Sequence, residues 1–328
     1  MISNIQIQTT FASQRSIDII IPVKNGGEEL IYNIDKWENQ SIPLNWQLYI
    51  YLVDDGSTDE ISLKIKKIYS NNKKIKVIRN HNSKGRAKAR NQGADAGQSE
   101  FIAFFDADCC PYSLDTIKTF IHTIEKHDSK IMFGSLKAVN NDFWGKYFQD
   151  VADRREKQFI KGDKAAFTTA NCVFSREIFY KAGKFDERYT KYGFEDKDLI
   201  LRLLKLDDDV YFVKNAQVIH NDVLSLKAVC RKMYIAGKYS STIFQKDHPD
   251  SYKKMAFYKA DVRNKKKLTK FVIFLLKKAK TPILLLSDKL LDFPLPYSFK
   301  AVIVKCCSGL YFSIGSSEPI SDQTFINI

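Results

Sequence analysis

The stretch Phe101-Ile-Ala-Phe-Phe-Asp106-Ala-Asp108 decides how the rest of this sequence is interpreted. A continuous apolar run of this length is typical of a strand covered on both faces, as in an α/β sheet. The two aspartates would then lie at the carboxyl end of that strand, where open α/β sheets bind their ligands. Two carboxylates there suit a divalent cation that holds phosphates. Aspartates at strand ends also begin turns or cap helices, so the neighbouring sequence must decide.

Composition and charge describe an ordinary globular chain with a basic end. The 328 residues are 44% hydrophobic and 27% charged, which argues against disorder over most of the chain. This length allows one large domain or two smaller ones. The net charge is +14, but residues 259–305 hold 12 basic and 3 acidic residues and so account for +9. This leucine-rich segment lacks the interleaved aromatic residues of a single-strand binding groove, so we expect no nucleic-acid partner.

The cysteines and the N-terminus indicate a reducing compartment. Two adjacent cysteine pairs and two single cysteines resemble neither a disulfide framework nor a zinc site. Residues 1–16 are polar and lack the apolar core of a secretory signal. We therefore expect a cytoplasmic protein.

Strand and helix patterns alternate along the first third of the chain. We expect strands at 17–23, 48–53, 75–79 and 101–105, separated by helices at 28–39, 59–69 and 86–97. Repeated βα alternation with short connections predicts a mostly parallel sheet with helices on both faces. The alternation fades after residue 130, where we expect strands at 130–139, 168–174, 210–213 and 217–219, a helix or ordered loop at 144–161, and helices at 196–206 and beyond 224.

Polar residues follow each of the first four strands, and each has a physical use for a nucleotide. An aspartate after the second strand can accept a hydrogen bond from a base or a ribose. Gly85 lets the backbone approach a ligand closely and begins a helix whose N-terminus, with Arg86, Lys88 and Arg90, attracts phosphates. The alternatives are a plain turn and helix cap at 55–57 and a solvated basic face on this helix.

Four stretches, taken together, resemble the family 2 glycosyltransferases, which have the GT-A nucleotide-diphospho-sugar transferase fold. They are Ile19-Ile-Ile-Pro-Val-Lys-Asn25, Val53-Asp-Asp-Gly-Ser-Thr-Asp59, Gly85-Arg-Ala-Lys-Ala-Arg-Asn-Gln-Gly93 and Phe101-Ile-Ala-Phe-Phe-Asp-Ala-Asp108, in the family's order and spacing. The resemblance implies an α/β, Rossmann-like, mostly parallel sheet flanked by helices. It also divides the chain into an N-terminal extension (1–15), a catalytic domain (16–222, with a nucleotide-binding half at 16–110 and an acceptor-binding half at 111–222) and a mainly helical, basic C-terminal region (223–328).

The resemblance also implies site residues in the nucleotide-binding half. Asp106 and Asp108 would form the DXD motif, which contacts the ribose and a Mn²⁺ or Mg²⁺ ion. The residues implied to bind the nucleotide-sugar are Pro22, Val23, Asn25, Asp54, Asp55, Gly85, Arg90, Asp106, Ala107 and Asp108.

Two further features belong to the second half of the predicted domain. Tyr192-Gly-Phe-Glu195-Asp196 resembles the acceptor-side Glu-Asp motif of inverting members, including galactosyltransferase-like ones. There Asp196 would be the general base for the acceptor hydroxyl and Glu195 would orient the acceptor; the alternative is acid in the first turn of a helix. His220 follows a short apolar strand and would join Asp108 and Asp106 as a metal ligand, unless it is structural. Asn171 and Arg176 are expected to shape the acceptor or sugar pocket.

The basic C-terminal segment contains an amphipathic helix. Leu268, Phe271, Val272, Leu275 and Leu276 recur at helical spacing, and lysines interrupt the apolar runs before they could span a bilayer. We expect peripheral attachment to an anionic membrane surface, on the cytoplasmic face. The alternative is a helix that packs on the catalytic domain or on a partner subunit.

These features together predict an inverting, metal-dependent glycosyltransferase. It would move a hexose or N-acetylhexosamine from a UDP-sugar to a glycan or lipid-linked oligosaccharide in polysaccharide or glycoconjugate biosynthesis. One alternative is a sugar-nucleotide nucleotidyltransferase, but the loop after the first strand is too short and too poor in basic residues for one. The other is a non-catalytic, basic membrane-binding protein.

Overall fold

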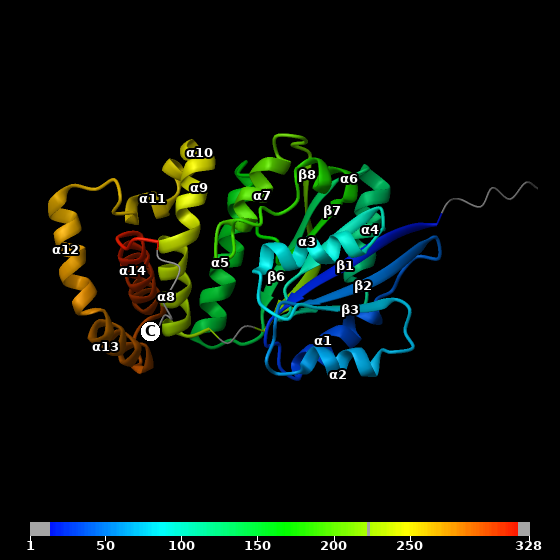
Figure 1. Ribbon diagram of the computed structural model, residues 1–328, viewed down its shortest axis with the longest axis horizontal. Helices are drawn as coiled ribbons and strands as arrows, with labels where there is room; N and C mark the ends of the chain where they lie inside the picture. The colour runs from blue at the N-terminus through cyan, green and yellow to red at the C-terminus, as the bar shows by residue number, and fades with distance from the viewer. Residues whose placement is uncertain (1–13, 222–223, 321–328) are drawn as a thin grey trace, which may run out of the picture.

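The computed structural model describes residues 14–221 and 224–320. It has two parts that lie side by side, a sheet flanked by helices and a group of C-terminal helices (Figure 1). The predicted N-terminal extension lies outside the described residues except for positions 14 and 15. The predicted boundary between the catalytic domain and the C-terminal region, at 222–223, also lies outside them.

One eight-stranded sheet forms the first part, in the order β3-β2-β1-β4-β7-β6-β8-β5. Strands β1 to β4 are parallel neighbours, as predicted, whereas β7 runs antiparallel to β4 and β6, and β5 runs antiparallel to β8. The strands are β1 (Arg15–Val23), β2 (Trp46–Asp54), β3 (Ile75–Arg79), β4 (Phe101–Phe105), β5 (Cys109–Pro111), β6 (Ile131–Ala138), β7 (Asn171–Ser175) and β8 (Val210–His220).

Strand β8 corrects one prediction. The two short strands expected at 210–213 and 217–219 are a single strand, paired with β6 along its length. Gly134 is opposite Val213 and the next residue, Ser135, is opposite Gln217, so the intervening residues of β8 bulge out of the ladder. A bulge breaks the alternation of side chains, and the sequence pattern therefore looks like two strands.

Helices cover both faces of the sheet, which explains the run at β4. Phe101, Ala103 and Phe105 point into one core, and Ile102 and Phe104 point into the other. All are buried, as a strand with two covered faces requires. The first core is covered by α1 (Glu29–Glu38), α2 (Ile61–Ile68) and α4 (Thr116–His127), and the second by α3 (Arg86–Ala96), α6 (Arg176–Lys181) and α7 (Glu195–Leu203).

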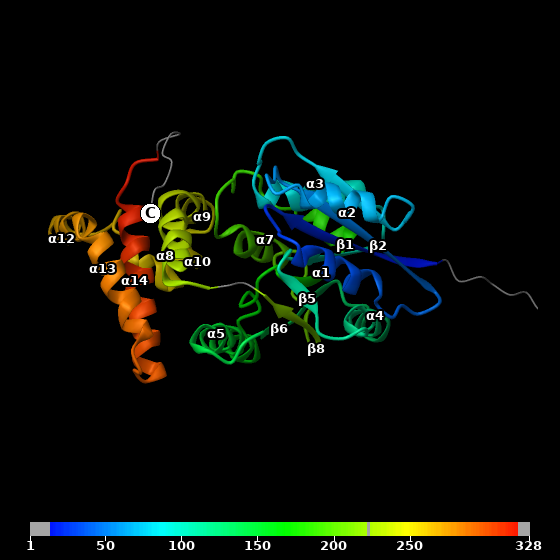
Figure 2. The same cartoon turned by 90° about the horizontal axis from the view of Figure 1, so that it is seen from below.

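The C-terminal helices have a core of their own and also extend the second core (Figure 2). Phe194, just before α7, contacts Phe244 with ring centroids 5.0 Å apart. Helix α5 (Phe143–Ile160) joins the two parts, since Phe143 and Trp144 pack against the C-terminal core. The C-terminal helices are α8 (Leu226–Ile235), η1 (Ala236–Ser240), α9 (Ser241–Asp247), α10 (Pro249–Lys254), α11 (Ala256–Ala260), α12 (Lys267–Lys278), α13 (Lys280–Asp292) and α14 (Tyr297–Ser316). Among the described residues, no helix combines the length and apolar character that crossing a bilayer requires.

Candidate functional site

The loops that follow β1 and β2 are hydrogen-bonded to each other at the carboxyl edge of the sheet. Val23 and Asp54 are register partners, so both strands end together. Asn25 has a positive φ of 55°, which asparagine tolerates better than most residues. Its Oδ1 accepts a hydrogen bond from the Thr58 amide (2.8 Å), and its own amide donates to Ser57 Oγ (2.9 Å). Asn25 thereby fixes the shape of both loops.

The two aspartates at the end of β2 are buried and hydrogen-bonded to backbone amides. Asp54 Oδ1 accepts from the Ser57 amide at 2.7 Å. Asp55 accepts from the amides of Lys84 (2.7 Å) and Gly85 (2.9 Å). Asp55 therefore positions the loop that leads into α3, a role the sequence analysis did not foresee.

Gly85 brings the two halves of the predicted domain into contact. Its φ is +94°, and a β-carbon there would lie 2.9 Å from the backbone of Thr190. Only glycine allows this approach without strain. The loop before α3 thus packs directly on the segment that leads to Glu195 and Asp196.

Arg90 lies at the centre of the site, and its side chain is only 1% exposed. Its guanidinium lies 2.7 Å from Asp106 Oδ1, 3.4 Å from Asp196 Oδ1 and 3.6 Å from Glu195 Oε1. Burial disfavours the charged guanidinium, but these carboxylates outweigh it and raise the pKa of Arg90. Burial likewise acts to raise the pKa of Asp106, but Arg90 and Arg86 outweigh it and lower that pKa. A solvated basic face is therefore the wrong interpretation for Arg90.

Glu195 and Asp196 begin α7 and differ in exposure. The Asp196 side chain is 23% exposed, and its Oδ1 accepts a hydrogen bond from Thr169 Oγ1 at 2.5 Å. The Glu195 side chain is 3% exposed and accepts from the Gly193 amide at 3.1 Å. Burial, followed by the charge of Asp196, raises the pKa of Glu195. Asp196 is thus the carboxylate of this pair that a substrate can reach.

Asp108 and His220 lie side by side although they are far apart in sequence. Nε2 of His220 is 3.6 Å from Oδ1 of Asp108. Two features produce this contact: Cys109 pairs with His220 in the β5–β8 ladder, and the His220 ring stacks on Phe148 with centroids 4.7 Å apart. Burial raises the pKa of the nearby Cys109 thiol well above its ordinary value, which disfavours the thiolate that a metal would need. A carboxylate beside an imidazole suits Mn²⁺, so the donor atoms fit the predicted ion.

Helix α1 supports the loop between β4 and β5, which the sequence analysis missed. Asn33 Nδ2 donates to the carbonyl of Ala107 at 3.0 Å, and Trp37 Nε1 donates to that of Cys109 at 3.1 Å. These two residues are four apart on the buried side of α1. That spacing is the signal in the sequence, but it is equally typical of core residues.

The expectation for Arg176 differs from the structure, whereas that for Asn171 stays a prediction. Arg176 lies at the opposite edge of the sheet, where its guanidinium binds Asp18 at 2.6 Å and the carbonyl of Ser99. Its assignment to the pocket was wrong, because β7 runs antiparallel and carries its last residues away from the site. Asn171 lies on the correct edge but is buried, and its Nδ2 donates to the carbonyls of Ser135 and Ala216.

A hollow lies between α5 and β6 and is also lined by Thr168 and Asn171, which flank the Thr169 that contacts Asp196. It has an empty volume of about 420 Å³, and its lining includes Arg155 and Thr168. Burial lowers the pKa of Arg155, and the charges of Tyr192 and Asp196 oppose this effect.

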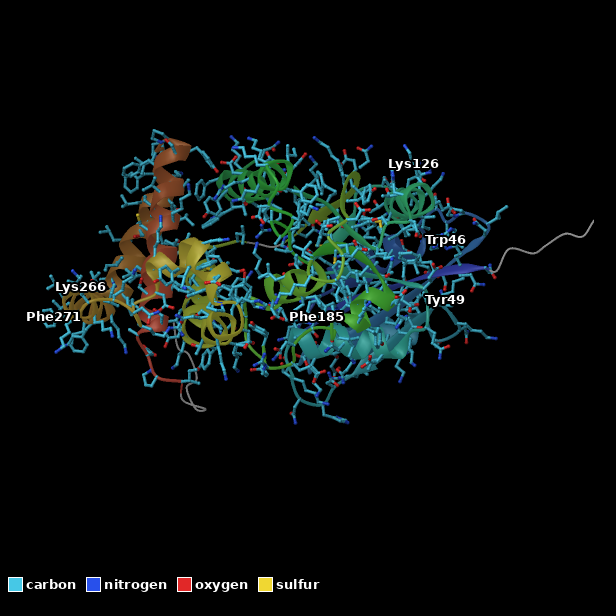
Figure 3. The ribbon with its side chains drawn as sticks, turned by 90° about the horizontal axis from the view of Figure 1, so that it is seen from above. Trp46, Tyr49, Lys126, Phe185, Lys266 and Phe271 are labelled. Atoms are coloured by element: carbon cyan, nitrogen blue, oxygen red, sulfur yellow. The ribbon has the colours of Figure 1, made fainter. Side chains whose placement is uncertain are left out.

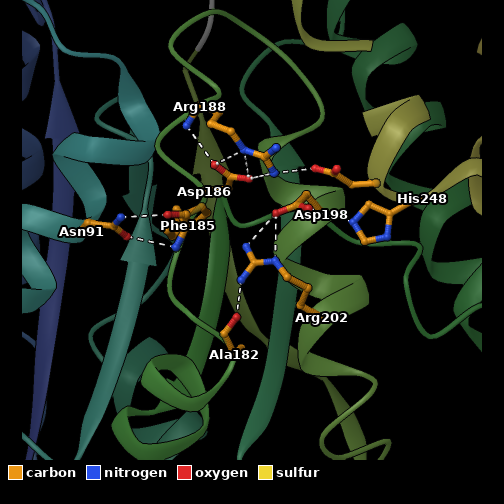
Figure 4. Close-up of polar contacts among 9 residues, drawn as sticks. Asn91, Ala182, Phe185, Asp186, Arg188, Asp198, Arg202 and His248 are labelled. Atoms are coloured by element: carbon orange, nitrogen blue, oxygen red, sulfur yellow. Dashed lines mark hydrogen bonds and ion pairs between the residues drawn. The ribbon is translucent and has the colours of Figure 1, made fainter. Parts of the chain in front are cut away.

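A cluster of ion pairs fixes α7 to the C-terminal helices (Figure 4). Asp198 Oδ1 lies 2.8 Å from Nε2 of His248, at the junction of α9 and α10. Three carboxylates come close enough to hold an ion, but each already faces a cation or an imidazole. The pairs are Asp198 with Arg202 and His248, and Arg188 with Asp186 and Asp247. The cluster is structural and holds the helix that carries Glu195 and Asp196.

Comparisons with known proteins agree with this architecture. One relative is the minor teichoic acid biosynthesis protein GgaA of Bacillus subtilis, which is 40% identical over 95 residues, covering 27% of this chain and 21% of GgaA. Another is the UDP-Glc:alpha-D-GlcNAc-diphosphoundecaprenol beta-1,3-glucosyltransferase WfgD of Escherichia coli, which is 28% identical over 126 residues, covering 38% of this chain and 47% of WfgD. These matches span about a fifth of GgaA and about half of WfgD. Among solved structures, the mannosyltransferase PcManGT of Pyrobaculum calidifontis, in complex with GDP-Man and Mn²⁺, has a TM-score of 0.58 at 14% identity, covering 91% of this chain and 86% of that one.

The family is shown by its sequence model. Residues 18–183, half of the chain, match the model described as glycosyl transferase family 2. This match includes β1 to β4 and the Asp106–Asp108 motif. The chain belongs to glycosyl transferase family 2 and is a glycosyltransferase.

Proposed function

We propose that this chain is an inverting, metal-dependent glycosyltransferase that uses a UDP-sugar donor. The sugar is a hexose or N-acetylhexosamine, and the acceptor is a glycan or a lipid-linked glycan in polysaccharide or glycoconjugate biosynthesis. The names of two relatives support this choice of donor and acceptor. One is a teichoic acid biosynthesis protein, and the other is a UDP-Glc-dependent enzyme with a diphosphoundecaprenol-linked substrate.

One observation carries the proposal: Arg90 joins the Asp106–Asp108 motif to Asp196. These acidic groups come from strand and helix ends that are 88 residues apart or more in the sequence. They meet at the carboxyl edge of the sheet, where α/β proteins bind ligands. A donor site and an acceptor site must adjoin for a sugar to pass between them, and this arrangement provides both.

Asp196 acts as the general base in this proposal. Its carboxylate takes the proton of the acceptor hydroxyl as that oxygen attacks the anomeric carbon. Thr169 and Arg90 hold the carboxylate in place. Because the base and the diphosphate leaving group lie on opposite sides of the sugar, the displacement is in line and inverts the anomeric carbon.

Glu195 orients the acceptor indirectly in this proposal. Its side chain is buried against Arg86 and Arg90, so it acts by fixing those two cations and the start of α7. Removing its charge would leave Arg90 with fewer partners and would loosen Asp196.

A divalent cation belongs beside Asp108 and His220. Mn²⁺ or Mg²⁺ bound there would supply positive charge next to the departing diphosphate. Asp106 is the third predicted ligand, but Arg90 already donates to its Oδ1, so Oδ2 is the atom available to the ribose or the ion. PcManGT, a structural neighbour, was solved with Mn²⁺.

The nucleotide occupies the loops after β1, β2 and β3 in this proposal. Asn25 and Asp55 fix the shape of those loops, and the positive end of α3 faces the diphosphate. The remaining members of the pocket are Pro22, Val23, Asp54, Gly85 and Ala107.

The location follows from the acceptor. A lipid-linked acceptor lies in the plane of a membrane, so we propose that the enzyme works at its cytoplasmic face, attached peripherally through the C-terminal region. The basic, amphipathic helix α12 supports this placement.

Release of UDP from a panel of UDP-sugars tests the proposed function. We expect slow hydrolysis of one or two donors that depends on added Mn²⁺ and is lost in EDTA. GDP-mannose serves as the control donor. No release from any nucleotide-sugar, together with UTP-dependent formation of a UDP-sugar from a sugar 1-phosphate, would identify a nucleotidyltransferase instead.

A further inference from the structure

Helix α12 presents its apolar side to the solvent. Leu268, Phe271, Val272 and Leu275, here called the α12 stripe, have exposed fractions from 44% to 74%. No residue of α12 is buried. Figure 3 shows Lys266 and Phe271 at the end of the molecule farthest from the sheet. Exposed apolar side chains gathered on one helix face indicate an interaction surface.

The opposite side of α12 contacts the rest of the chain. Ile273 packs against the C-terminal core, and Lys277 pairs with Glu318 at 2.8 Å. The side of α12 that carries Ile273 and Lys277 therefore faces the rest of the chain, and the α12 stripe faces the solvent. Its exposure shows that the stripe is not buried against the described residues of the catalytic domain.

The segment of the chain that carries the α12 stripe is strongly basic. From Arg263 to Lys280 the chain carries eight basic residues, and it carries no acidic residue between Asp261 and Asp288. Lys266, Lys267 and Lys270 are exposed at the N-terminal end of α12, the end that also carries Leu268 and Phe271. The following helix, α13, adds exposed Leu285 and Leu286.

We propose that the α12 stripe and its lysines bind the surface of an anionic lipid bilayer. The apolar side chains enter the boundary between headgroups and acyl chains, while the lysine stems extend toward the headgroup phosphates. Charge decides the partner: two copies of this chain that joined through the stripe would bring two sets of like charges together, whereas anionic lipids neutralise them. The inference rests on the proposed peripheral attachment and deepens it by naming the side chains and the lipid charge involved, but lipid binding requires no transfer chemistry.

Vesicle flotation of the full chain tests this surface. We expect flotation with vesicles of phosphatidylcholine and phosphatidylglycerol, and little with phosphatidylcholine alone. The triple variant Leu268→Ser, Phe271→Ser, Leu275→Ser should lose flotation. The matched control Leu44→Ser, Leu63→Ser, Ile68→Ser changes three exposed apolar residues on other elements and should float like the original chain.

Lysine substitutions provide an independent measurement. Each basic residue near an anionic surface contributes about fivefold to the partition coefficient. Lys266→Gln, Lys267→Gln, Lys270→Gln should therefore weaken binding on the order of 100-fold, whereas the control Lys66→Gln, Lys67→Gln, Lys73→Gln should change it little.

Separate readouts distinguish failure of this inference from failure of the proposed function. UDP-sugar hydrolysis in solution should be equal in the stripe variant and its control. Equal flotation of stripe and control variants would overturn the inference. A stripe variant that changes from dimer to monomer on gel filtration without any lipid dependence would also overturn it, because the stripe would then join two copies.

Discussion

Nη2 of Arg90 lies 2.7 Å from Oδ1 of Asp106, and Nη1 of the same side chain lies 3.4 Å from Oδ1 of Asp196. Arg90 is thus a buried cation that pairs both with Asp106 of the Asp106–Asp108 motif and with Asp196, the proposed base. Arg90 also holds the pKa of Asp106 below its ordinary value. The geometry of the two motifs is therefore coupled through a single side chain.

Replacement of Arg90 should damage both stability and activity. Arg90→Met removes the buried cation that Asp106, Glu195 and Asp196 share, which costs about 3–5 kcal/mol in the free energy of unfolding. Lys88→Met is the matched control: Lys88 pairs with Glu187 at 2.9 Å with side chains 39% and 43% exposed, so we expect a loss of at most about 1 kcal/mol. Urea unfolding followed by tryptophan fluorescence measures both. Similar losses in the two variants would contradict the central role of Arg90.

The carboxyl edge of the sheet could be predicted from the sequence, and the position of Arg90 could not. Parallel strands bring their ends together, so the apolar run to Asp106 and the polar residues after β1, β2 and β3 had to meet. In contrast, α3 has no marked apolar face, and two of the three carboxylates around the buried Arg90, those of Glu195 and Asp196, lie more than 100 residues later. Local sequence contains no trace of such a long-range partner.

The positions of His220 and Thr169 also depend on long-range pairing that the local sequence does not show. The family resemblance pointed to His220, but its place beside Asp108 depends on the antiparallel pairing of β5 with β8. Thr169 reaches Asp196 because β7 begins at the carboxyl edge of β4 and runs back along it. Strand direction cannot be derived from apolar alternation, so Thr169 was missed and Arg176 was misplaced.

Asp196→Asn should abolish transfer while leaving donor binding intact. The amide keeps the shape of the carboxylate but cannot take a proton, so we expect the turnover number to fall by about 10²–10⁴-fold. Calorimetric titration with UDP and Mn²⁺ should give an unchanged affinity, because Asp196 does not touch the nucleotide in the proposed site. Asp209→Asn changes an exposed carboxylate and is the control. Retained turnover in the Asp196 variant would remove this residue from the role of base.

Asp108→Ala and His220→Ala should weaken metal binding in particular. Each removes one donor atom of the pair that lies 3.6 Å apart, and we expect the Mn²⁺ concentration for half-maximal UDP release to rise about tenfold or more. UDP binding in EDTA should be the same in these variants as in the unchanged chain. His122→Ala, at an exposed position on α4, provides the control for loss of an imidazole. If the variants respond to Mn²⁺ as the original chain does, the ion is held elsewhere.

The ion pair between Asp186 and Arg188 should make the free energy of unfolding depend on pH. Burial alone would raise the pKa of Asp186, but hydrogen bonds from Arg188 outweigh it and hold that pKa below its ordinary value. The folded state therefore gains stability from the ionised carboxylate above about pH 4, and the gain is lost as the pH falls through the lowered pKa. Asp186→Asn should accordingly lower the melting temperature most at neutral pH, with a gap that narrows toward about pH 3.5.

The control for the Asp186 variant is Asp250→Asn. The Asp250 side chain is 88% exposed and pairs with Lys253 at 3.2 Å within one helix. Solvent screens such a pair, so its melting temperature should follow the original chain at every pH. Because Arg188 also binds Asp247 in the C-terminal helices, the Asp186 variant should loosen the support of α7 as well. Melting curves recorded across this pH range by circular dichroism measure the gap. A gap that stays constant would mean that the carboxylate of Asp186 contributes through its shape and not through its charge.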